Sequence, residues 1–119
     1  MAAHSRTGLS ISRPVVREIK RFLKDNNIDC MSVDPFVKSH AAPENDNQVI
    51  DQVANVWAEI ANECNCHISL WHHTRKTGGA PITIDDVRGG SAIVGVVRLV
   101  RILNVMTVEE AKRAGVEYP

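Results

Sequence analysis

The stretch QVIDQVANVWAEIANECNCHISLWHH, residues 48–73, decides the fold class, because a helix pattern runs directly into a strand pattern. Residues 48–64 place their apolar side chains on one face of a helix, and Asn45 or Asp46 lies where an N-terminal cap is needed. These apolar residues are Val49, Val53, Val56, Trp57, Ile60 and Cys64. Residues 66–73 are predicted to form a buried strand that ends on two histidines.

The residues before this stretch show the same order of helix and strand. Residues 10–27 carry a helical apolar face, with Ser10 or Ser12 as the cap and Pro14 in the first turn. Residues 28–34 are short and mostly apolar and end in a carboxylate, which predicts a buried strand of the parallel kind.

The residues after it continue the alternation. Residues 74–88 are polar and rich in glycine, which predicts a long loop. Gly95 is expected to separate a short helix from a third strand, residues 96–103, and Thr107 with Glu110 forms the capping box of a last helix. Strands that alternate with amphipathic helices indicate an α/β fold, in which helices flank a parallel sheet within one domain.

The composition narrows the function classes. A chain of 119 residues has the length of one domain, and its 14 cations and 14 anions leave no net charge. A basic field over the whole protein is therefore excluded, whereas a local basic loop is not. No apolar run approaches the roughly 20 residues of a membrane span, and the N-terminus does not resemble a signal peptide. We expect a cytoplasmic protein with no membrane partner, whose three cysteines form no disulfide framework.

Two predicted strands end in polar residues, Asp34 on the first and His72-His73 on the second. Ligands bind at the carboxyl ends of strands in open parallel sheets. Asp34 could hold Mg²⁺ through water beside a phosphate, or it could simply cap the Asp-Pro turn. The histidines could be a structural pair, metal ligands, or sensors of a phosphate or an attacking water. The Cys-x-Cys-His sequence before this strand is not a standard zinc spacing.

The predicted loop, residues 74–88, contains the cations Arg75, Lys76 and Arg88 between pairs of glycines. It could be a solvated mobile loop in which these charges are incidental. It could also bind nucleic acid, or send an arginine to a phosphate bound by a neighbouring subunit, because the planar guanidinium contacts phosphate oxygens bidentately.

Three segments in register, IDCMSVDPF, HISLWHHTRK and VRGGSAIVGVVRLVRIL, resemble the RecA-like ATPases. The similarity is to the branch near the plasmid replication helicase RepA, a group often described as AAA-family ATPases of phages and mobile elements, and it runs from about residue 7 to residue 118. It implies a parallel sheet flanked by helices and the cofactors ATP and Mg²⁺. It also implies self-association, or association with a full-length homologue, in a ring that is commonly a hexamer and moves on single-stranded DNA.

The resemblance also implies roles for individual residues. Asp34 would be the Walker B aspartate that binds Mg²⁺, and His72 and His73 would be the pair that senses the nucleotide. Residues 74–88 would then be the DNA-facing loop that receives their signal.

The cations of this region would contact phosphates. Arg75 and Lys76 lie in the DNA-facing loop, and Arg88 would reach across a subunit interface as a catalytic arginine. Arg98 and Arg101 on the third predicted strand compete with Arg88 for that role.

One departure from the family is decisive for activity. The sequence contains no G-x-x-x-x-G-K-[ST], the motif that cradles nucleotide phosphates. We therefore expect residues 1–119 to correspond to the C-terminal half of the ATPase core, truncated on its N-terminal side and inactive alone. The alternatives are a non-catalytic module that joins or regulates ATPase rings and, less favoured, a small metal-dependent enzyme built on Asp34, His72 and His73.

Overall fold

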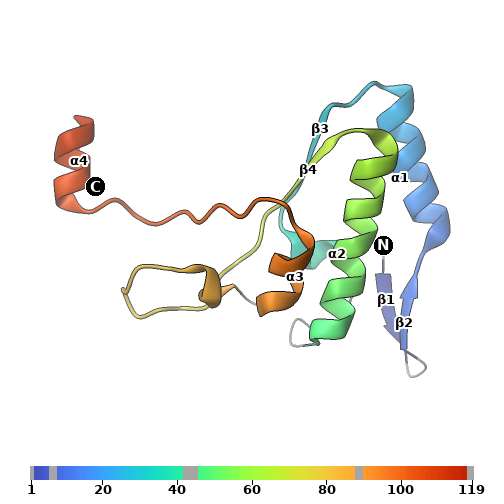
Figure 1. The fold of residues 1–119 in the computed structure, drawn as a ribbon, viewed down its shortest axis with the longest axis horizontal. Helices are drawn as coiled ribbons and strands as arrows, with labels where there is room; N and C mark the ends of the chain where they lie inside the picture. Colours follow the sequence, from blue (N-terminus) through green and yellow to red (C-terminus); the bar gives the residue numbers. More distant parts are fainter. Residues whose placement is uncertain (1, 6–7, 42–45, 88–89, 118–119) are drawn as a thin grey trace.

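Two helices pack on one face of a two-stranded parallel sheet in the folded body of the protein (Figure 1). The computed structural model describes residues 2–5, 8–41, 46–87 and 90–117. The helices are α1 (Arg13–Asp25) and α2 (Asn47–Cys64), and the strands are β3 (Cys30–Val33) and β4 (His67–Leu70). The α/β class with a parallel sheet flanked by helices is thus confirmed, and it is consistent with a truncated RecA-like fold.

Both long helices begin and end for local reasons. Pro14 lies in the first turn of α1, where its missing N–H costs nothing. The carboxylate of Asp46 accepts a hydrogen bond from the backbone N–H of Val49 at 3.2 Å and caps α2. Asn65 ends α2 in the left-handed conformation, at φ 49° and ψ 46°, so that the chain turns directly into β4.

The core forms where the apolar faces of the helices meet the sheet. Val53 and Ile60 of α2 and Phe36 after β3 are fully buried, and Val16 and Leu23 of α1 are nearly so. One side of the sheet packs against this cluster through the following residues: Met31, Val33, Ile68 and Leu70. The alternate residues of the strands, which are Cys30, Ser32, His67 and Ser69, therefore belong to the opposite side.

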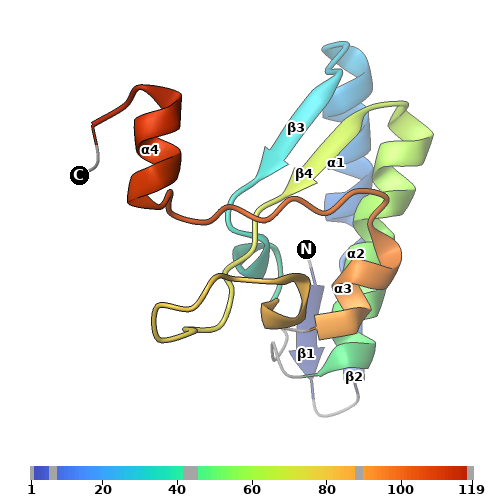
Figure 2. The same ribbon diagram turned by 60° about the vertical axis from the view of Figure 1, so that its left-hand side comes forward.

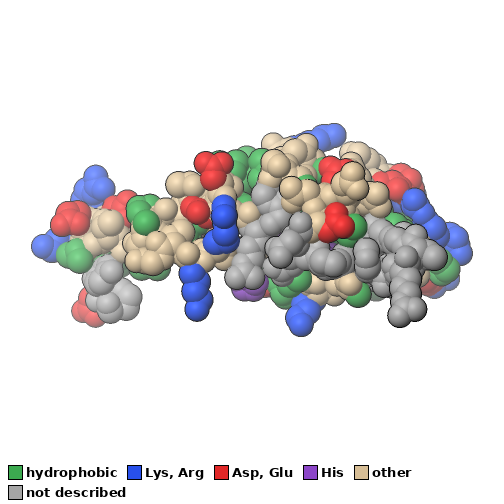
Figure 3. All heavy atoms as spheres, turned by 90° about the horizontal axis from the view of Figure 1, so that it is seen from below, with side chains coloured by type: hydrophobic (Ala, Val, Ile, Leu, Met, Phe, Trp, Pro, Cys, Tyr) green, Lys and Arg blue, Asp and Glu red, His purple; other side chains and the backbone are tan. Residues whose placement is uncertain are grey.

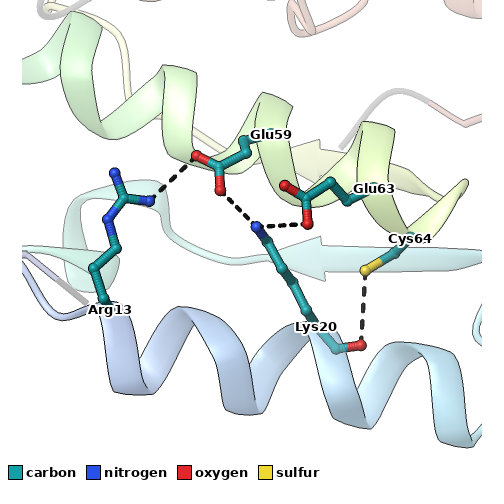
Figure 4. Close-up of polar contacts among 5 residues, drawn as sticks. All are labelled: Arg13, Lys20, Glu59, Glu63 and Cys64. Atoms are coloured by element: carbon teal, nitrogen blue, oxygen red, sulfur yellow. Dashed lines mark hydrogen bonds and ion pairs between the residues drawn. The ribbon is translucent and has the colours of Figure 1, made fainter.

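An ionic cluster joins the two helices along their outer side (Figure 4). The ammonium group of Lys20 on α1 lies 2.5 Å from Glu59 Oε1 and 2.9 Å from Glu63 Oε2 on α2. The guanidinium of Arg13 adds a contact of 3.3 Å to Glu59 Oε2. The thiol of Cys64 donates to the backbone oxygen of Lys20 across 3.7 Å, so α1 and α2 are joined by polar contacts as well as by the core.

The strand boundaries differ from those predicted. The first predicted strand, residues 28–34, is reduced to Cys30–Val33, and the second, residues 66–73, is reduced to His67–Leu70. His72 and His73 consequently follow the strand instead of forming its end. The N-terminal residues, which carry little sequence signal, form the antiparallel pair β1 (Ala2–Ser5) and β2 (Gly8–Ile11).

The prediction of a third strand at residues 96–103 is wrong. Helix α3 (Gly90–Val96) continues through Gly95, and residues 97–107 then run without a strand partner among the described residues to α4 (Val108–Ala114). Figures 1 and 2 show this segment leaving the body and carrying α4 on the side away from α1. A strand needs a neighbour for its backbone hydrogen bonds, and no strand of the described chain lies in that position.

Helix α4 has the predicted capping box. The hydroxyl of Thr107 accepts from the backbone N–H of Glu110, and the Glu110 carboxylate accepts from the backbone N–H of Thr107. Gly115 ends the helix at φ 67° and ψ 26°, in the left-handed region. None of the described helices is both long enough and apolar enough to cross a membrane.

Candidate functional site at the carboxyl ends of β3 and β4

The backbone pairing of the two strands continues past their ends and fixes the polar residues that follow them. The N–H of Trp71 donates to the oxygen of Val33 at 3.0 Å, and the N–H of Phe36 donates to the oxygen of Trp71 at 2.7 Å. The register therefore places Asp34 beside Trp71 and one residue from His72. The structure brings the carboxylate residue and the histidine pair to one edge of the sheet, the ligand-binding edge of this architecture.

Phe36 connects the two strand ends through its aromatic ring. It begins the short 3-10 helix η1 (Phe36–Ser39) and is fully buried. Its ring centroid lies 5.7 Å from that of His72 and 5.0 Å from that of His40, both in edge-on geometry. Trp57 of α2 donates from its indole N–H to the hydroxyl of Ser39 at 3.3 Å, which ties η1 to the helix layer.

The two histidines of the predicted pair have different environments. His72 is half-buried against the ring of Phe36, whereas His73 is exposed beside it. The structure therefore offers one histidine as a packing element and the other as a surface group.

Asp34 is exposed at this edge, where a carboxylate can bind Mg²⁺ through water. Among the described residues no group of three or more His, Cys, Asp or Glu side chains is arranged to hold a metal ion. Asp34 thus offers a single exposed carboxylate at this edge, and the described residues gather no ligand cluster around Asp34, His72 and His73.

The loop after the histidines is folded at its base. Thr74 and Val87 form an antiparallel bridge, and the N–H of Arg75 donates to the oxygen of Asp86 at 2.8 Å. The guanidinium of Arg75 donates to the backbone oxygen of Asp85 at 2.6 Å, so this cation helps to close the loop. Lys76 follows it and is exposed.

The far part of the loop is a tight turn followed by a short 3-10 helix. Gly78 and Gly79 have φ values of 65° and 99°, which a residue with a side chain rarely adopts. Thr83 and Asp86 then form a capping box around η2 (Ile84–Asp86). The hydrogen bonds from the backbone N–H and the hydroxyl of Thr83, with the nearby charge of Arg75, hold the pKa of Asp86 below its ordinary value.

The remaining cations are not gathered at this edge. Arg88 lies outside the described residues. Arg98 contacts the side-chain oxygen of Asn62 at 3.5 Å at the end of α2, and Arg101 is exposed on the segment that leaves the body. In the view from below, cationic and anionic side chains of the described residues are interspersed along the molecule (Figure 3).

Sequence reasoning missed three residues of this site. His40 lies in the polar stretch after the first predicted strand, whereas Phe36 follows Asp34-Pro35 directly, which is a signal that the chain turns back into the core. Trp71 falls within the predicted buried strand, residues 66–73, but 48% of its surface is exposed beside Asp34.

Comparison with known proteins gives one family. A family model described as an AAA domain matches residues 1–79, which include β3, α2, β4 and the histidine pair. No curated protein and no solved structure matches the chain.

Proposed function

The chain belongs to the AAA domain family, and from this membership and the geometry of the strand ends we propose that it is the non-autonomous half of a DNA-linked ATPase. Domains of this family are ATPases that use a nucleotide with Mg²⁺. In our proposal the chain acts in DNA replication or recombination, within a ring formed with further copies or with a full-length homologue. The observation that carries the proposal is the convergence of Asp34, Trp71 and the histidine pair at one sheet edge.

The residues present fit only part of a nucleotide site. Asp34 is the group that would hold Mg²⁺ through water, and the bound Mg²⁺–ATP would supply the phosphoryl group for hydrolysis. The sequence lacks the backbone cradle and the lysine that bind the phosphates. We therefore propose that the isolated chain does not hydrolyse ATP and that a partner must supply the phosphate-binding loop.

Neighbouring positions along the chain and one ring contact connect Asp34 to the loop. Asp34 is two residues from Phe36, whose ring touches His72, and His72 is two residues from Thr74 at the loop base. A shift of the Asp34 backbone would therefore move the histidine and the closed base of the loop together. This connection supports the proposed role of His72 and His73 as sensors that report to the loop.

The first experiment measures ATP hydrolysis with Mg²⁺, by the chain alone and after mixing with the phosphate-loop half of a related AAA domain. We expect no turnover alone and turnover in the mixture. Asp34→Asn should lower that turnover about 10- to 100-fold, as is typical when an outer-shell metal contact is lost. Asp29→Asn, an exposed change at the opposite end of β3, is the matched control. Turnover by the chain alone that depends on Asp34 would refute the proposed inactivity.

The second experiment tests the loop as a DNA contact in the same mixture. Lys76→Ala should weaken binding of single-stranded DNA and reduce the slope of affinity against salt by about one charge. Lys112→Ala on α4 removes an exposed cation far from the loop and should change neither quantity. Equal loss in both variants would mean that binding is diffuse and that the loop is not the DNA contact.

A further inference from the structure

The segment between α3 and α4 carries several of the most exposed large apolar side chains of the described residues. We call residues 97–107 the arm. Leu99 is 73% exposed, Leu103 is 66% exposed and Val105 is 81% exposed. Leu99, Leu103 and Val105 stand at odd-numbered positions, so in an extended segment their side chains lie on one side, which we call the uncovered row, while Met106, 49% exposed, lies on the other.

The arm is held in place at both ends. Val97 packs against the core, and the side-chain amide of Asn104 exchanges two hydrogen bonds with the backbone of Ile82, at 2.8 and 3.0 Å. The uncovered row therefore cannot turn back onto the body of its own molecule without breaking these contacts. Leaving three large apolar side chains in water costs free energy that a docking partner would recover.

The opposite side of the molecule carries a surface of matching character. An apolar groove of about 580 Å³ runs between α1 and the start of β3. Its apolar lining consists of Ile19, Phe22, Leu23, Ile28, Cys30 and Met31. Phe22 is 61% exposed, which is unusual for a phenylalanine on a helix that packs on a sheet.

The same groove borders a free strand edge. The N–H of His67 donates to the oxygen of Asp29 and that of Trp71 to the oxygen of Val33, so the odd-numbered residues of β3 turn their backbone groups toward β4. The backbone N–H and C=O groups of Cys30 and Ser32 point away from β4, to the edge of β3 where no strand of the described chain pairs with them. An extended segment laid there would gain backbone hydrogen bonds and place alternate side chains in the groove.

The charges of the two surfaces are also complementary. The arm contains Arg98 and Arg101 and no acidic residue. On the groove, Glu18 is paired with Arg21 at 2.5 Å, which leaves the carboxylate of Asp25 to meet a cation. Arg101 lies between Leu99 and Leu103 in the uncovered row, so its guanidinium is positioned to pair with the carboxylate of Asp25.

We propose that the arm of one copy of this chain adds as a strand to the free edge of β3 in a second copy, with Leu99 and Leu103 in the groove of that copy. The partner is a second copy because one chain supplies both surfaces, and because the arm leaves the body on the side away from α1 (Figures 1 and 2), the helix that lines its own groove. This interface gives the self-association in the proposed function a specific surface. It requires neither nucleotide nor DNA.

Sedimentation of the purified chain over a range of concentrations, without nucleotide or DNA, tests the interface. We expect concentration-dependent association that Leu99→Asp with Leu103→Asp weakens at least about 100-fold, because carboxylates would enter an apolar groove. Phe22→Asp should have the same effect from the groove side. Val116→Asp and Val15→Asp, exposed changes outside the arm and the groove, are the matched controls. Circular dichroism shows whether each variant keeps its helices.

Two further results decide the proposal. A mixture of the arm variant with the groove variant should associate, since each retains the surface that the other lacks. Arg101→Glu should weaken association, and adding Asp25→Lys should restore it. A chain that stays monomeric at about 1 mM, or association that survives both the arm and the groove variants, would overturn the interface. ATP hydrolysis by the mixed halves tests the proposed function separately. Either of these results would overturn the interface and would leave that test open.

Discussion

Lys20 is a long cationic side chain of which only 15% is exposed, and two carboxylates of the neighbouring helix surround its ammonium group. The hydrogen bond that its ammonium group donates to Glu59, followed by the one that it donates to Glu63, raises the pKa of Lys20 above the ordinary 10.5. The bond from Lys20 in turn is the main cause that lowers the pKa of Glu59, and Arg13 adds to it. Lys20 and Glu59 therefore each stabilise the charged form of the other across the α1–α2 contact.

Lys20→Met should lower the free energy of unfolding by about 1 kcal/mol at pH 7, the upper range for an ion pair near the surface. Urea denaturation followed by circular dichroism measures this change. The control is Arg21→Met, whose pair with Glu18 is more than 60% exposed on both sides and should contribute almost nothing. Equal effects of the two substitutions would show that the partial burial of Lys20 does not matter.

The same cluster predicts a pH dependence. The pKa of Glu59 is lowered by folding, so its contribution is present above its ordinary value of 4.5 and is lost as pH falls through the lower folded value. The pKa of Lys20 is raised, so its contribution is complete below its ordinary value of 10.5 and is lost as pH rises through the folded value. The stability difference between the parent and Lys20→Met should thus be widest between these limits and should narrow at both ends.

Phe36 connects the end of β3 to the end of β4, because its buried ring packs against His72. Phe36→Ala should cost about 3–5 kcal/mol, because a fully buried ring would leave a cavity. Phe36→Leu keeps most of the volume and should shift the imidazole proton resonances of His72, which lies against the ring. Phe22→Leu replaces an exposed ring and should leave the imidazole proton resonances of His72 unchanged. Unchanged His72 signals in Phe36→Leu would show that the ring contact does not couple the strand ends.

At the scale of the elements, the helices were predictable because their causes are local. The apolar face of residues 48–64, the Asp46 cap and the Thr107–Glu110 capping box all lie within one or two turns of the residues that they stabilise. The observed bounds of the two long helices accordingly agree with the patterns to within three residues, since residues 10–27 form Arg13–Asp25 and residues 48–64 form Asn47–Cys64.

The strands and the site were predictable only in part, because their causes are not local. The alternation in residues 96–103 is that of a strand, yet the described chain offers no neighbour for it. The edge on which Asp34 and His72 meet followed from parallel topology. The contact of Phe36 with His72, and the bond of Arg75 to the backbone of Asp85, depend on turns that no periodicity reports.

The loop after β4 provides a prediction for one element. Asp86→Ala removes the capping box with Thr83, and hydrogen exchange at the Arg75 amide, which bonds to the Asp86 backbone, should become faster. In the parent, the same loosening should appear as pH falls through the folded pKa of Asp86, which lies below its usual 3.8. Glu110→Ala removes the equivalent box from α4 and should not change exchange in the loop.

The whole molecule is more extended than its length requires. Its radius of gyration is 17.0 Å, whereas a compact domain of this length has about 13.5 Å. The difference comes from the arm and α4, which project from a body that is otherwise well packed (Figure 2). An extended segment with exposed backbone is a good protease substrate, whereas a strand in a sheet is not.

Brief digestion with trypsin should therefore cut first after Arg101 in the middle of the arm and only later after the α1 cations, which are held in helix. If the arm adds to β3 of a second copy, this first cut should become slower as the chain concentration rises, at constant protease-to-chain ratio. Leu99→Asp with Leu103→Asp should remove that protection, while Val116→Asp should keep it. Cleavage at Arg101 at the same rate at every concentration would mean that the arm stays solvated. Early cleavage within α1 would mean instead that the body, and not the arm, is the least stable part of the molecule.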